Sequence, residues 1–193
     1  MTIRQSILQF LYPFITLFSG LFKSGVVNNS KQVVPQSSFY SLSATLNNGQ
    51  QFLFDSLKGY KVIVVNTASD CGFTAQYAQL EELYQQHKNK LKIIAFPAND
   101  FKNQEQGNDN DIATFCKLNY GVTFILMQKS SVIGTNKNEV FNWLSSKEQN
   151  GWSNQQPQWN FCKYFIDENG VLQTYFPTSI SPLSKTFIKE INK

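Results

Sequence analysis

Cys71 is the residue best placed to do chemistry in this chain. It follows a continuous β-branched run at residues 62–65, which predicts a buried central strand, and it precedes the helical pattern of residues 75–87. Near a helix N-terminus, unpaired N–H groups and the helix dipole favour the thiolate, which is the nucleophilic form of cysteine. The residues alone leave a second interpretation equally open, in which Cys71 is a half-buried structural cysteine of a strand-to-helix turn.

Three further side chains carry N–H groups that can donate to an anion. Gln104 lies in a long polar loop after a predicted strand, and Trp159 and Asn160 directly precede another predicted strand. Residue type alone favours turn polarity for Gln104 and Asn160 and core filling for Trp159. Cys116 lies on the apolar side of a predicted helix, where residue type alone favours a small buried hydrophobic role.

Composition excludes several other classes of site. The three cysteines, Cys71, Cys116 and Cys162, are too few and too far apart for a disulfide framework, and His87 is the only histidine, so we expect no metal site and no Cys-His protease pair. The net charge of +4 comes from scattered lysines, which predicts no nucleic-acid site. The 193 residues, 41% hydrophobic, suit one domain with a sizeable core.

The N-terminus differs in character from the rest of the chain. An apolar run from Ile7 to Phe22 follows Arg4, but it is short for a membrane span and is interrupted by Pro13 and Gly20. It indicates a signal peptide or signal anchor, hence the secretory pathway or a membrane contact; the alternative is an amphipathic or disordered extension of a cytoplasmic protein. Residues 25–38 have the composition of a polar linker. We therefore divide the chain into residues 1–37, an apolar segment with its linker, and residues 38–193, the folded domain.

The predicted elements give an α/β fold. Two strands at residues 39–45 and 51–54 form an N-terminal β-hairpin around an Asn-Asn-Gly turn, and a second buried strand covers residues 91–96. Helices are expected at residues 75–87, 109–120 with Asp109 as its cap, 139–146 and 182–191. Strands at residues 161–166 and 171–176 are joined by a hairpin turn. This order predicts a mixed central sheet flanked by helices, in a thioredoxin-like fold.

Three motifs together resemble those of the glutathione peroxidase family. They are NTASDCGFT around Cys71, FPANDFKNQEQG around Gln104, and WNFCKYFIDENG, which begins with Trp159 and Asn160. Their order and spacing match, and the similarity runs from about Phe39 to the closing helix. The resemblance implies a catalytic tetrad of Cys71, Gln104, Trp159 and Asn160. It implies reduction of hydrogen peroxide and organic or lipid hydroperoxides through a Cys71 sulfenic acid, without a cofactor.

The stretch ATFCKLNYGVTF is similar to the non-selenium, thioredoxin-dependent members of that family. It implies that Cys116 is the resolving thiol and that thioredoxin is the reductant. A disulfide needs Cα atoms within about 7 Å, so we expect the two sulfurs to lie well apart in the reduced protein and the Cys116 helix to unwind partly in turnover. Glutathione as reductant, a redox sensor that passes oxidation to a partner protein, and an inactive binding module remain alternatives. The short segment between Ile133 and Gln158 implies a monomer.

The sequence departs from the family pattern at three positions. Asp100 stands where the family usually has glutamine, and a carboxylate near Cys71 would raise the pKa of the thiol. Gln106 and Ile125 stand where proline is usual, which affects loop geometry more than chemistry. Cys162 matches no functional position, and we expect it to be structural.

Overall fold

The computed structural model describes residues 5–7, 10–12 and 25–192. A six-stranded mixed sheet forms the centre, with strands in the order β1-β8-β7-β4-β5-β6. Its middle strand β4 (Lys61–Thr67) pairs parallel with β5 (Leu91–Pro97) and antiparallel with β7 (Lys163–Ile166). The remaining members are β8 (Leu172–Phe176) and two edge strands of two residues each, β1 (Val27–Asn28) and β6 (Ile125–Leu126).

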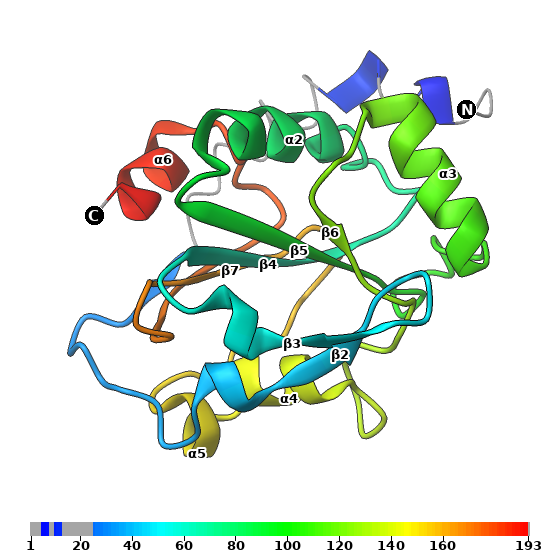
Figure 1. Cartoon of the computed structure of the whole chain (residues 1–193). Coiled ribbons are helices and arrows are strands. Elements are labelled where there is room, and N and C mark those ends of the chain that lie inside the picture. The colour runs from blue at the N-terminus through cyan, green and yellow to red at the C-terminus, as the bar shows by residue number, and fades with distance from the viewer. Residues whose placement is uncertain (1–4, 8–9, 13–24, 193) are drawn as a thin grey trace.

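Alternate residues of β4 build two separate cores. Ile63 and Val65 pack on the face covered by α2 (Gln76–His87), α3 (Asp109–Tyr120) and α6 (Lys185–Ile191). Val62 and Val64 pack on the opposite face, against α4 (Glu139–Leu144) and the hairpin of β2 (Ser43–Thr45) and β3 (Gln51–Leu53). Figure 1 shows the three helices on one side of the sheet and the hairpin, α4 and α5 (Lys147–Asn150) on the other. Both faces of β4 are therefore buried, as its uninterrupted apolar run predicts.

The thioredoxin-like α/β prediction is confirmed, with local differences. Residues 39–41 form a 3-10 helix rather than the start of a strand, because the Ser38 side chain accepts from Tyr40 N–H and caps it. A second 3-10 helix covers Phe54–Leu57. The cap of α3 is Asn108 rather than Asp109: its side chain accepts from Asp111 N–H, and the Asp111 carboxylate accepts in return from Asn108 N–H. The last helix begins only at Lys185, after its cap Ser184.

The stretch expected to be a linker, residues 25–38, contributes to the fold. Val27 and Asn28 pair antiparallel with Tyr175 and Thr174 of β8. The buried Asn29 side chain donates to the carbonyls of Val33 (2.8 Å) and Leu172 (3.2 Å). Asparagine and serine side chains can bond either to backbone groups or to solvent. Because polar composition does not distinguish these two cases, it predicted a linker.

Most of the apolar run from Ile7 to Phe22 lies outside the described residues. Of the part that is described, Tyr12 is buried, with its ring edge-on to Phe73 at 6.3 Å and its hydroxyl donating to Gln79 at 2.9 Å. No helix within the described ranges has the length and apolar character needed to cross a membrane.

Candidate active site

Cys71 lies in a tight turn directly after β4. Its Sγ accepts from Phe73 N–H at 3.5 Å, and its own N–H donates to Thr74 Oγ1 at 3.0 Å. The Thr74 hydroxyl also lies within hydrogen-bond distance of the carbonyls of Ala68 and Cys71, which closes the turn on itself. Helix α2 begins only at Gln76, so Cys71 precedes the helix by one turn instead of opening it. The nearest backbone donor to the sulfur is consequently a turn amide.

Gln104 is bound to this turn through its backbone. Asp70 N–H donates to Gln104 O at 3.0 Å. The two residues ahead of Gln104, Lys102 and Asn103, have left-handed backbones with φ of 53° and 51°, a conformation that is uncommon for residues other than glycine. Asn99 holds the loop beyond them, since its Oδ1 accepts from Glu105 N–H at 2.9 Å. The loop is thus tightly constrained on both sides of Gln104.

The side chains of Asn160 and Gln104 meet although they are 56 positions apart. Asn160 Nδ2 donates to Gln104 Oε1 at 2.9 Å. Gln104 accepts through its oxygen, so its NH2 group keeps the capacity to donate. Asn160 is fully buried, and Trp159 packs against Phe101 at 5.7 Å between ring centroids. The two segments that were predicted to supply donors are therefore adjacent in space.

Opposing effects act on the pKa of the Cys71 thiol. Burial raises the pKa of Cys71 and is the largest effect. Hydrogen bonds from Phe73 N–H and from the Asn160 and Trp159 side chains lower that pKa, and the Asp70 charge raises it. The neutral N–H donors thus favour the thiolate against burial and a neighbouring carboxylate.

The carboxylate near Cys71 is Asp70, and Asp100 has other partners. Asp100 accepts from Ser131 Oγ at 2.8 Å and from Val132 N–H at 2.7 Å. Its contacts fix the loop after β6, so the departure from the family pattern at this position serves loop structure. Asp70, directly before the cysteine, is a residue that the sequence reasoning missed.

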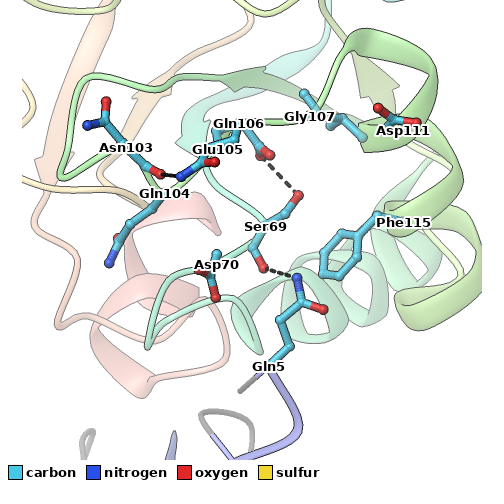
Figure 2. Close-up of a pocket in the computed structure, with 11 residues that line it drawn as sticks. Gln5, Ser69, Asp70, Asn103, Gln104, Glu105, Gln106, Gly107, Asp111 and Phe115 are labelled. Atoms are coloured by element: carbon cyan, nitrogen blue, oxygen red, sulfur yellow. Dashed lines mark hydrogen bonds between the residues drawn. The ribbon is translucent and has the colours of Figure 1, made fainter. Parts of the chain in front are cut away.

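A pocket of about 500 Å³ lies beside the Cys71 turn. Figure 2 shows Ser69 near its centre, with Ser69 Oγ donating to Glu105 at 3.1 Å and Gln5 of the N-terminal segment donating to Ser69 O at 3.2 Å. Burial raises the pKa of Glu105 to about 7. Three carboxyl groups line the pocket, those of Asp70, Glu105 and Asp111, and no basic side chain is among its described lining residues.

Cys116 lies on the buried face of α3, together with Ile112 and Tyr120. Burial raises the pKa of its thiol to about 12; a hydrogen bond with Tyr77 lowers the pKa, and the Glu105 charge raises it. Cys71, Cys116 and Cys162 are all unbonded. The structure is therefore that of the reduced protein.

Cys162 has the contacts of a packed structural thiol. It is fully buried, Tyr175 OH donates to its Sγ at 3.2 Å, and Thr178 Oγ1 lies 3.5 Å from the same sulfur. Its neighbour Lys163 is also fully buried and donates to Gln76 Oε1 at 2.7 Å and to Ile180 O at 2.5 Å. These contacts join β7 to the start of α2 behind the candidate site. Within the described ranges, no group of three or more His, Cys, Asp or Glu residues could hold a metal ion.

Comparison with known proteins gives one consistent result. Residues 39–145 match the family model described as glutathione peroxidase. The chain is 44% identical over 149 residues to glutathione peroxidase-like peroxiredoxin 2 of Saccharomyces cerevisiae, which covers 77% of this chain and 92% of that protein. It is 44% identical over 141 residues to a glutathione peroxidase of Lactococcus lactis, covering 72% and 89%.

Solved structures agree with this result. The crystal structure of Trgpx in apo form superposes with a TM-score of 0.62 at 29% identity, over 82% of this chain and 97% of that one. A thiol:disulfide interchange protein of the thioredoxin family from Chlorobium tepidum superposes with a TM-score of 0.53 at 16% identity, over 83% and 94%, a likeness in fold alone.

Proposed function

Because the chain belongs to the glutathione peroxidase family and is a thiol peroxidase, we propose that Cys71 is its attacking thiol, with Gln104, Trp159 and Asn160 as the donors that assist it. The supporting observation is the 2.9 Å hydrogen bond between Asn160 and Gln104, together with the backbone bond from Asp70 to Gln104. These contacts bring the two donor loops to the Cys71 turn.

The reaction follows from this arrangement. The Cys71 thiolate attacks the terminal peroxide oxygen, the O–O bond breaks, and the sulfur becomes a sulfenic acid while water or an alcohol leaves. Negative charge moves from sulfur to the departing oxygen, which takes up a proton. Uncharged donors fixed in place can stabilise both charges without reorganising, and this is the effect that an oxyanion hole exerts.

We propose that Cys116 resolves the sulfenic acid and that a thioredoxin-type dithiol reduces the resulting disulfide. The relatives named as peroxiredoxins support a thiol-based cycle. The pocket beside Cys71 is lined by carboxyl groups, which repel the two carboxylates of glutathione. A protein dithiol can instead approach from outside. Cys116 is buried on the inner face of α3, and we propose that α3 opens when its sulfur reacts with Cys71.

The test is peroxide-dependent oxidation of thioredoxin by the full chain. We expect Cys71→Ser to abolish it and Cys116→Ser to reduce it at least a hundredfold, while one equivalent of peroxide still converts Cys71 to a trappable sulfenic acid in the second variant. Cys162→Ser is the matched control and should retain turnover. Undiminished thioredoxin oxidation by Cys116→Ser would reject the resolving role, and undiminished oxidation by Cys71→Ser would reject the site.

A relay that oxidises a partner protein uses the same two cysteines and differs only in its reductant. Multiple turnovers with thioredoxin and no other protein support the peroxidase cycle. A stable mixed disulfide with a client protein, without turnover, would support the relay.

We also propose that the chain is a monomer and that its N-terminal apolar run contacts a membrane. Ile7, Phe10 and Leu11 are exposed although Gln5 and Tyr12 on either side of them contact the domain beside Cys71. Such a contact would bring the pocket close to lipid hydroperoxides. Flotation with neutral phosphatidylcholine vesicles tests it; a chain lacking residues 1–24 should lose vesicle binding and retain activity on hydrogen peroxide.

A further inference from the structure

The backbone that carries Trp159 and Asn160 has an unusual shape. Phe161, the residue directly after Asn160, has φ of 63°, in the left-handed region that a bulky side chain seldom adopts. Such a conformation persists only where the surroundings hold it. Thr178 supplies one contact, because its Oγ1 donates to Asn160 O at 2.7 Å.

Asn66, at the carboxyl end of β4, supplies the other contacts. Its side chain Nδ2 donates to Trp159 O at 3.0 Å, and its Oδ1 accepts from Cys162 N–H at 3.0 Å. Its main-chain carbonyl accepts from Phe161 N–H at 2.6 Å. One fully buried residue therefore binds the backbone before Asn160 and at both positions after it.

We propose that Asn66 is a positioning residue for the peroxidase reaction, which fixes the backbone around Asn160 so that the Trp159 and Asn160 side chains meet the Cys71 sulfur. This inference rests on the proposed function of Cys71. Asn66 does not touch the peroxide itself; it acts through the two donors. It precedes Cys71 by five positions on the same strand and turn, so the nucleophile and its donors are both attached to the end of β4.

A purely structural role is the competing explanation, and the chain contains a matched control for it. Asn150 is also fully buried and also binds the backbone through its side chain: Nδ2 donates to the carbonyls of Trp143, Leu144 and Ser153, and Oδ1 accepts from the amides of Trp152 and Ser153. It belongs to α5, on the sheet face opposite α2 and α3. Replacing Asn150 removes five side-chain hydrogen bonds, against two for Asn66, but leaves the Cys71 surroundings intact.

The experiment measures thiolate formation at Cys71 in a Cys116→Ser, Cys162→Ser background, where Cys71 is the only thiol. The rate of alkylation by iodoacetamide is followed against pH for Asn66→Ala, for Asn150→Ala and for the parent. The Asp70 carboxylate, whose charge acts on the Cys71 thiol, and the Glu105 carboxyl, which accepts from Ser69 Oγ at 3.1 Å, are present in all three proteins.

We expect Asn66→Ala to raise the midpoint of the alkylation profile by about one pH unit, and to slow peroxide reduction at neutral pH by about tenfold, as expected for losing hydrogen bonds to a charged group. Asn150→Ala should lower the unfolding temperature and leave the midpoint unchanged. A folded Asn66→Ala protein with the parental midpoint would overturn the proposal, and so would an equal shift in Asn150→Ala.

If Asn66→Ala does not fold, Asn66→Ser is measured in its place. A raised midpoint in that variant would support the proposal, and the parental midpoint would overturn it. The midpoint depends on the surroundings of the thiol and not on turnover or reductant. A protein that lacks Cys71-dependent peroxide reduction would therefore reject the proposed function, while the alkylation profile would still test Asn66.

Discussion

At the scale of single residues, Cys71 depends on neutral donors. Phe73 N–H, Asn160 and Trp159 lower the pKa of its thiol, whereas burial and the Asp70 carboxylate raise it. Many reactive cysteines are paired with a cation or lie at a helix N-terminus. Here the helix begins five residues after Cys71, and the charged group that affects the pKa of the thiol is the Asp70 carboxylate, which is negative. The balance should be sensitive to a change of one charge.

Asp70→Asn tests this balance. Because the Asp70 charge raises the pKa of Cys71, its removal should lower the midpoint of Cys71 alkylation by roughly 0.3–0.7 pH units, if the interaction is worth about 0.4–1 kcal/mol, the upper part of the range for partly exposed charge pairs. The thiolate fraction at neutral pH should then rise about two- to fivefold, together with the second-order rate constant for hydrogen peroxide in stopped-flow measurements.

The control for this variant is Asp100→Asn. Its carboxylate accepts from Ser131 and Val132, so the substitution should lower stability and leave the alkylation midpoint unchanged. An unchanged or higher midpoint in Asp70→Asn would mean that the charge does not act on the sulfur as described.

The sequence motifs assigned Cys71, Gln104 and Asn160 to one site, and in the structure Gln104 bonds to Asn160 and to Asp70, the residue before Cys71. They did not indicate that Asp70 is the carboxylate near the thiol, or that Asn66 binds the backbone around Trp159 and Asn160. A hydrogen bond from a buried side chain to distant backbone has no periodicity in sequence, so only coordinates reveal it. Signals existed at both positions: Asp70 adjoins Cys71, and Asn66 interrupts a β-branched run.

At the scale of elements, α3 combines well-formed ends with an inward-facing thiol. The Asn108–Asp111 capping box fixes its first turn, and Gly121 ends it in a left-handed conformation with φ of 63°. Cys116 lies between Ile112 and Tyr120 on the buried face. The proposed disulfide with Cys71 predicts that this helix opens along the face that holds it on the sheet.

Amide hydrogen exchange should detect that opening. After one equivalent of peroxide, we expect residues 109–120 to exchange at least tenfold faster than in the reduced protein, because unwinding removes the helical hydrogen bonds. Helix α2, on the same face, should change little. Cys116→Ser treated in the same way provides the comparison, and equal acceleration in that variant would attribute the change to sulfenic acid formation rather than to the disulfide.

Long elements with strong patterns were predictable, and short ones were not. The strands β4 and β5 and the helices α2 and α3 agree with their predicted ranges to within one or two residues, because apolar periodicity over many positions defines them. Strands β1 and β6 have two residues each, too few for any periodicity, and they exist because the sheet offers them a partner.

At the scale of the whole molecule, the segment before the hairpin connects distant parts of the fold. After β1 pairs with β8, Gln36 N–H and Ser37 N–H donate to Gln149 O of α5, and Trp143 Nε1 of α4 donates to Ser37 O at 2.8 Å. The segment therefore runs from the edge of the sheet to the helices of one face. A boundary drawn at residue 38 separates these parts from their partners.

Two truncated chains test the contribution of this segment. A chain beginning at Gly25 should unfold in urea much like the full chain, whereas one beginning at Ser38 should lose about 2–4 kcal/mol, from several lost hydrogen bonds and the unpartnered Trp143 indole. Equal midpoints for the two chains would show that residues 25–37 are dispensable. Peroxide reduction by Cys71 should survive in any fraction that remains folded.

The two-residue length of both outer strands has a consequence for the proposed cycle, in which α3 opens at each turnover. While α3 is displaced, apolar side chains are uncovered and another copy of the chain could bind there. Sheet growth between copies needs a long edge strand with unpaired backbone groups. Here β1 and β6 have only two residues each, and Leu126 O of β6 already accepts from Asn47 N–H at 3.1 Å. Repeated oxidation and reduction can thus proceed at high protein concentration with reclosure as the favoured outcome over fibrillar association.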